Sequence, residues 1–147
     1  MIAVDTNILV YAHREDSPFH AIAYRRIAEL AEGHANWAIP WPCLHEFISL
    51  VTNRRGYSPA STLDEVFRAI QAWMGSPTLV LLSETSSHWK TIQELLQNGR
   101  AAGPLIHDAK IAAICLQHGV RELWSADRDF SRFARLKTVN PLIETLA

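Results

Sequence analysis

Short apolar runs alternate with longer segments of helical periodicity along this chain, and that order constrains its fold more than any other feature. A run of three or four apolar residues is long enough for a buried strand and too short for a helix that could stand alone. We expect strands at residues 2–4, 37–39, 79–82, 122–125 and 136–139, with helices between them. This alternation predicts an α/β sandwich around a mostly parallel sheet.

The size and charge of the chain narrow the possible functions. No internal repeat, low-complexity segment or linker divides the 147 residues, so residues 1–147 are expected to form a single domain. The formal net charge of −1 argues against binding of nucleic acid through bulk positive charge. Such a ligand would be held through local arginines, or through metal ions that offset the protein's own acids.

Several features predict a cytoplasmic protein that does not enter a membrane. No run approaches the roughly 18 apolar residues of a membrane span. The start of the chain lacks a basic region and carries Asp5, so a signal peptide is not expected. Cys43 and Cys115 each lie inside an apolar helical pattern, which favours buried free thiols over a disulfide.

Four acids occupy comparable places relative to the expected strands and helices. Asp5 and Asp127 each follow a strand, whereas Glu46 and Asp108 lie near the N-terminal ends of helices. In a doubly wound sheet, the carboxyl ends of strands and the N-terminal ends of the following helices share one rim. All four acids can therefore face one cleft, although they are scattered over most of the sequence.

A cluster of carboxylates favours metal chemistry. Crowded carboxylates repel one another, and burial adds a desolvation cost, so a divalent cation among them would stabilise the group. Oxygen ligands suit hard cations such as Mg²⁺ or Mn²⁺, whereas the seven histidines show no zinc-type spacing. A metal held by acids near a phosphodiester can activate water and stabilise the leaving oxygen, which predicts phosphoryl hydrolysis.

Each acid also has a plain structural explanation when it is taken alone. Asp5 could cap the following helix, and Asp127 could be a turn residue. Asp108 could favour the dipole of its helix, and Glu46 could be a solvated helix acid. Only the placement of all four together favours a catalytic site.

Four motifs in this order and spacing resemble the PIN-domain nucleases. They are Asp5-Thr6-Asn7-Ile8-Leu9-Val10-Tyr11, Glu46-Phe47, His107-Asp108-Ala109 and Ser125-Ala126-Asp127-Arg128-Asp129-Phe130. The resemblance covers residues 2–141, and the length is similar to that of VapC-type toxins of bacterial toxin–antitoxin pairs. It implies a three-layer PIN-like sandwich and a metal-dependent endoribonuclease that leaves 5′-phosphate and 3′-hydroxyl ends. It also implies a homodimer that is inhibited by a cognate VapB-type antitoxin.

The resemblance assigns roles to the acids by position. Asp5, Glu46, Asp108 and Asp127 correspond to an acidic quartet that holds Mg²⁺ or Mn²⁺. Asp5 and Asp108 are the expected direct ligands of the metal. Asp129 is expected to assist, because the last motif offers two acids.

Four further residues are expected to support the quartet. Thr6 and Asn7 fit a role in orienting Asp5 or in contacting phosphate. Ser125 stands where threonine is common in the family and keeps the hydroxyl group. Arg128 lies between two candidate acids and is the basic residue best placed to contact an RNA phosphate.

Three other classes of protein compete with a nuclease. An aspartyl-phosphate phosphatase would use Asp5 as the nucleophile, but it would carry a second acid where this chain has Asn7. A dinucleotide-binding domain would need a Gly-x-Gly-x-x-Gly motif after the first strand, and none is present. A non-catalytic RNA-binding or interaction module would be favoured by loss of a quartet acid, and none is lost.

The five tryptophans could form the core or stack on nucleic-acid bases. Trp73, Trp89 and Trp124 lie in patterned elements and are expected in the core. Trp37 and Trp41 flank the end of a strand, and the sequence leaves both roles open for them.

Overall fold

A computed structural model describes residues 1–143 and places a parallel sheet at the centre of the molecule. Within these residues five strands pair in the order β3-β2-β1-β4-β5, and every neighbouring pair is parallel. The strands are β1 (Ile2–Val4), β2 (Trp37–Pro40), β3 (Leu79–Leu82), β4 (Glu122–Trp124) and β5 (Lys137–Val139). The predicted mostly parallel sheet is confirmed; β1 and β3 have the expected ends, and each of the other three strands differs from its expected range by one residue at one end.

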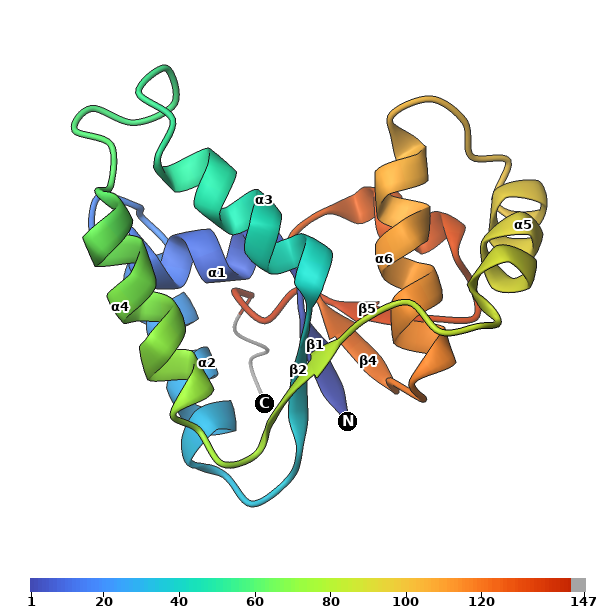
Figure 1. Cartoon of the computed structure of the whole chain (residues 1–147), viewed down its shortest axis with the longest axis horizontal. Coiled ribbons are helices and arrows are strands. Elements are labelled where there is room, and N and C mark those ends of the chain that lie inside the picture. The colour runs from blue at the N-terminus through green and yellow to red at the C-terminus, as the bar shows by residue number, and fades with distance from the viewer. Residues whose placement is uncertain (144–147) are drawn as a thin grey trace.

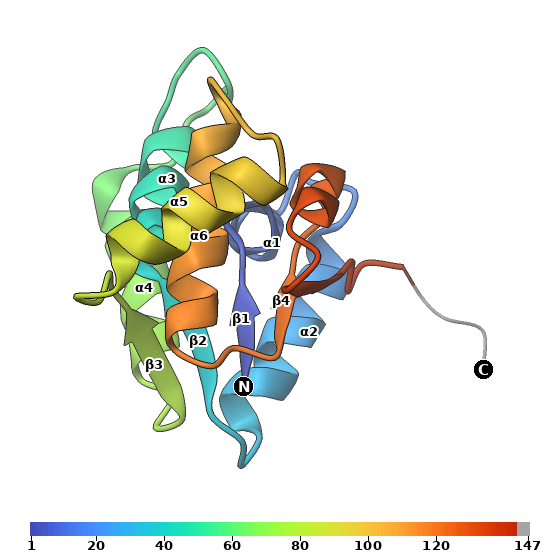
Figure 2. The same ribbon diagram turned by 90° about the vertical axis from the view of Figure 1, so that its right-hand side faces the viewer.

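Helices cover both faces of the sheet, as the alternation of elements predicts. They are α1 (Thr6–His13), α2 (His20–Glu32), α3 (Trp41–Val51), α4 (Leu63–Met74), α5 (His88–Asn98), α6 (Leu105–Gln117) and the 3₁₀ helix η1 (Arg128–Arg132). Figures 1 and 2 show α1, α2 and α4 on one side of the sheet and α5 and α6 on the other, which makes three layers. Within residues 1–143, no helix combines the length and the apolar character needed to cross a membrane.

The central strand β1 sets the position of the residues at the rim. Ala3 is in register with Ala38 of β2 on one side and with Leu123 of β4 on the other. The three strands therefore end at one edge, where α1, α3 and the segment leading to η1 begin. Side chains that follow β1 and β4 become neighbours there, although about 120 residues separate them in sequence.

Both cysteines, and two of the three tryptophans expected in the core, lie where the sequence predicts; Trp37, whose role the sequence left open, also belongs to the core. Cys43 and Cys115 are buried free thiols, as predicted. Trp37 is fully buried and Trp124 is 8% exposed. Trp73 is half-buried and packs against Phe47, with ring centroids 5.0 Å apart.

The prediction that Trp89 belongs to the core is wrong, because its side chain is 73% exposed. The buried face of α5 is centred on Leu95, and Ile92 and Leu96 are half-buried beside it. Trp89 lies in the first turn of α5, outside this face. Helical periodicity indicates a stripe of apolar residues, but it does not indicate where along the helix the covering neighbour ends.

Two isoleucines on α6 test how much of the stability depends on burial. Ile114 is fully buried and Ile106 is 43% exposed. We expect Ile114→Ala to lower the free energy of unfolding by about 2–5 kcal/mol, because the truncation leaves a cavity in a packed interior. The matched variant Ile106→Ala should cost less than about 1 kcal/mol. Urea unfolding followed by circular dichroism measures both, and equal losses would contradict this packing of α6.

Candidate active site

Asp5 is a buried carboxylate at the carboxyl end of β1. Its side chain is only 5% exposed, and its backbone N–H donates to the carbonyl of Trp124 at 2.9 Å. The Ser125 hydroxyl donates to Oδ2 at 2.7 Å, and the Cys43 thiol lies 3.5 Å from Oδ1. Burial raises the pKa of Asp5, and the Ser125 hydrogen bond opposes that rise. Asp5 is the N-cap residue of α1 but makes no side-chain capping bond, so capping does not explain this carboxylate.

A polar network joins Asp5 to the segment that follows β4. The Asn7 amide nitrogen lies 3.2 Å from the Ser125 hydroxyl and 3.4 Å from Asp5 Oδ2, and donates to both. Asn7 Oδ1 accepts from the backbone N–H of Ala126 at 3.2 Å. The backbone N–H of Asp127 donates to the Ser125 hydroxyl at 3.0 Å. Asn7 and Ser125 therefore orient the Asp5 carboxylate and fix the start of the segment that carries Asp127.

Glu46 lies on the α3 side of the same rim. It is exposed, and Thr6 Oγ1 donates to its Oε2 at 3.1 Å. Thr6 is buried, so this contact ties the first turn of α1 to α3. The hydroxyl of Thr6 thus supports Glu46, whereas sequence reasoning expected it to orient Asp5 or to contact phosphate.

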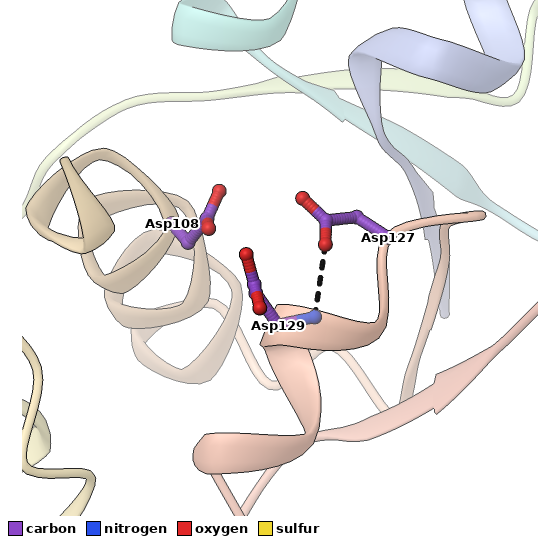
Figure 3. Close-up of side chains that lie close together, drawn as sticks. All are labelled: Asp108, Asp127 and Asp129. Carbon is purple, nitrogen blue, oxygen red and sulfur yellow. Dashed lines mark hydrogen bonds between the residues drawn. The ribbon is translucent and has the colours of Figure 1, made fainter.

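The carboxylates of Asp108, Asp127 and Asp129 form the tightest acidic group among the described residues. One oxygen of each lies within 4.8 Å of the others, and Figure 3 shows the three side chains pointing toward one another. Asp127 Oδ1 also accepts from the backbone N–H of Asp129 at 2.8 Å, which caps η1. Asp127 therefore has the expected turn role and faces the cluster as well. Asp5 and Glu46 lie outside this group of three.

Electrostatic repulsion nevertheless links all five acids. The pKa of Asp108 is raised from 3.8 to about 6, first by burial and then by the charges of Asp127, Asp5, Asp129 and Glu46. The charges of these four acids all raise the pKa of Asp108, so the predicted quartet and Asp129 face a common region. Helix α6, the rim after β1 and the segment after β4 bring these residues together.

The donor set fits a hard divalent cation. The group offers carboxylate oxygens close together, and burial and the charges of the other acids raise the pKa of Asp108. Mg²⁺ and Mn²⁺ favour such oxygen ligands and would remove this repulsion. Asp108, Asp127 and Asp129 are the residues that could hold the ion together.

Two other residues complete the description of the site. Arg128 is exposed at the start of η1 and lines a hollow of about 340 Å³ together with Ser125 and Asp127. Sequence reasoning missed the thiol of Cys43, which contacts Asp5. No local pattern could indicate that contact, because it depends on how α3 packs beside α1.

Solved structures share this fold. VapC20 from Mycobacterium tuberculosis, described as a sarcin-ricin loop cleaving toxin, superposes with a TM-score of 0.65 at 20% identity. That match covers 89% of this chain and 93% of the other. VapBC2 from Rickettsia felis, solved with a DNA fragment from its promoter, gives a TM-score of 0.64 at 22% identity. It covers 95% of this chain and 98% of the other.

Sequence comparison identifies the family. The sequence model of the PIN domain matches residues 2–136. Ribonuclease VapC43 from Mycobacterium tuberculosis is 38% identical over 143 residues, which are 97% of this chain and 96% of the relative. Ribonuclease VapC25 from the same organism is 31% identical over 143 residues, or 97% of this chain and 100% of the relative. The chain therefore belongs to the PIN-domain family, and within it to the VapC ribonucleases.

Proposed function

We propose that this protein is an endoribonuclease toxin that depends on Mg²⁺ or Mn²⁺ and that its 147 residues carry a single PIN domain, of which the structure describes residues 1–143. The convergence of Asp5, Glu46, Asp127 and Asp129 on Asp108 carries the proposal, because such repulsion is tolerated where a cation is bound. The names of the relatives support RNA as the substrate. An RNA substrate makes the cytoplasm the expected place of action.

The acids of the site would bind the cation, and a neighbouring basic residue would position the RNA. Asp108, Asp127 and Asp129 would hold the cation, and the buried Asp5 would add its negative charge from its fixed position against Ser125. When it is bound, such a cation supplies activation of water and neutralises charge on the phosphate. Arg128 at the edge of the site would position an adjacent phosphate of the RNA.

Glu46 would serve as the proton acceptor. Its carboxylate is exposed, and Thr6 engages Oε2, which leaves Oε1 to accept a proton from the attacking water. The oxygen of that water would form a bond to phosphorus while the bond from phosphorus to the 3′-oxygen breaks. The departing 3′-oxygen would take up a proton from solvent water, so the products carry a 5′-phosphate and a 3′-hydroxyl.

The burial of Asp5 disfavours the aspartyl-phosphate alternative. A nucleophilic carboxylate must reach a phosphorus atom, but Asp5 is 5% exposed and both its oxygens are engaged. The Asn7 amide also lies against Oδ2. A non-catalytic module on the same fold is disfavoured because every acid of the quartet is present and interacts with Asp108.

An apolar groove supports an antitoxin partner. A hollow of about 350 Å³ lies between α1, α2 and α4, and its apolar lining includes Ala12, Tyr24, Ile27, Ala28, Ala72 and Trp73. A groove between helices suits the apolar face of a partner segment. The structural relatives include VapBC toxin–antitoxin complexes, which agrees with a VapB-type partner.

The exposed Leu63, Phe67 and Met74 of α4 support self-association into a homodimer.

Two carboxylate substitutions test the proposed activity. Asp5→Asn and Asp108→Asn should each reduce RNA cleavage by about 100-fold or more, because each removes a charge that the reaction needs. Asp64→Asn, a matched change of an exposed acid on α4, should leave cleavage unchanged. Purified variants with native circular dichroism are compared on labelled RNA in Mg²⁺ or Mn²⁺, and the product ends are mapped. Full cleavage by either site variant, or products with 2′,3′-cyclic phosphate ends, would contradict the mechanism.

Stability as a function of pH tests the electrostatics of the site without a substrate. Because the folded-state pKa of Asp108 is about 6 against an ordinary 3.8, the metal-free protein should lose stability as pH rises through this range. Asp108→Asn should therefore raise Tm above about pH 7 and have little effect near about pH 4. Added Mn²⁺ should stabilise the wild type more than the variant. A variant with no gain in Tm above pH 7 would show that repulsion does not act on Asp108.

Coexpression tests the partner. Expression of the protein alone should arrest growth, and coexpression of a cognate VapB-type antitoxin should relieve the arrest. Ala72→Arg places a charge in the groove and should prevent relief while RNA cleavage persists, whereas Gln71→Arg, on the same helix outside the groove lining, should not. Relief that is equally strong with Ala72→Arg would exclude this groove as the antitoxin site.

A further inference from the structure

A further hollow of about 560 Å³ lies between the beginning of α3, the end of β3 and helix α6. Its polar and aromatic lining consists of Trp41, His45, Ser83, Glu84 and Lys110. We propose that this hollow binds one nucleotide of a single-stranded RNA, with the base stacked on Trp41 and a phosphate contacted by Lys110. The inference rests on the proposed ribonuclease function and identifies how its substrate is held.

The hollow adjoins the acidic site through both of its helices. On α3, His45 immediately precedes Glu46, and on α6, Lys110 follows Asp108 by two residues. Residues one or two apart on a helix point in different directions, so the hollow does not include these acids, but it lies within one helical turn of them on both helices. A strand of RNA with its scissile phosphate at the acids would place a neighbouring nucleotide here.

Trp41 is suited to stacking because it is not used in the core. Its side chain is 37% exposed, whereas Trp37, four residues earlier, is fully buried. The centroid of the His45 ring lies 5.9 Å from that of the Trp41 ring, with 35° between the planes, so the two rings form a tilted pair one helical turn apart. Every base has a face that can stack on such rings, and this mode of binding requires no particular base.

The other groups of the hollow match the remaining parts of a nucleotide. Lys110 provides a fixed positive charge for a phosphate, which a protein of net charge −1 with an acidic site must supply locally. The Ser83 hydroxyl and the Glu84 carboxylate can hydrogen-bond to the edge of an unpaired base. The volume lies within the roughly 300–1,000 Å³ of typical ligand pockets.

The test measures binding of RNA separately from its cleavage. A labelled single-stranded RNA octamer with nuclease-resistant phosphorothioate linkages is titrated with protein in Mg²⁺ and followed by fluorescence anisotropy. Trp41→Ala should weaken binding about 10-fold, and Trp41→Phe should retain most of the affinity. Trp89→Ala removes an indole on α5 that is more exposed than Trp41 and lies outside the hollow, so it should have no effect. Lys110→Gln should lower the slope of log affinity against log salt by about 0.7.

The outcomes separate this inference from the proposed activity. The shift of Tm caused by Mn²⁺ should be unchanged in Trp41→Ala, which shows that the acidic site is intact. Unchanged affinity of Trp41→Ala and Lys110→Gln, or no binding of RNA by the wild type, overturns the inference even if ordinary RNA is cleaved. Binding that depends on Trp41, combined with a failure to cleave RNA in Mg²⁺ and Mn²⁺, would support the hollow and refute the ribonuclease.

Discussion

Parallel pairing of β1 with strands on both sides is the constraint on which the site depends. Ala3 is aligned with Ala38 and Leu123, so β1, β2 and β4 end at the same edge of the sheet. The side chain of Asp5 then meets Ser125, which lies 120 residues later in the chain. A shift of β4 by one residue would turn Ser125 to the opposite face and break this contact.

Once the rim is formed, the acids are held close together against their own repulsion. The pKa of Asp108 is about 6 because burial and four neighbouring carboxylates all disfavour its charge. Such an arrangement destabilises the folded chain in the absence of a cation, and arrangements of this kind concentrate at functional sites. The surrounding hydrogen bonds from Ser125, Asn7 and Thr6 keep the carboxylates in place despite that cost.

Sequence reasoning was most reliable where the local pattern and the fold both depend on the burial of apolar side chains. The alternation of apolar runs and helical segments predicted the strands and the parallel sheet, because burial of one face selects the period of each element. The same reasoning failed for Trp89, which continues the apolar pattern of α5 but lies beyond the face that is covered. It also gave Asp129 only an assisting place, whereas Asp129 belongs to the tightest acidic group.

The sequence by itself determined which residues stand at the carboxyl rim, because strand ends and helix starts can be read from periodicity and turn chemistry. That was enough to select Asp5, Glu46, Asp108 and Asp127 as candidates. Only the tertiary structure decided which of them touch. Asp108 meets Asp127 and Asp129, whereas Asp5 is enclosed by Ser125 and Cys43. These distances depend on the order of the strands and on the packing of α3 and α6, and both arise from contacts between segments far apart in the chain.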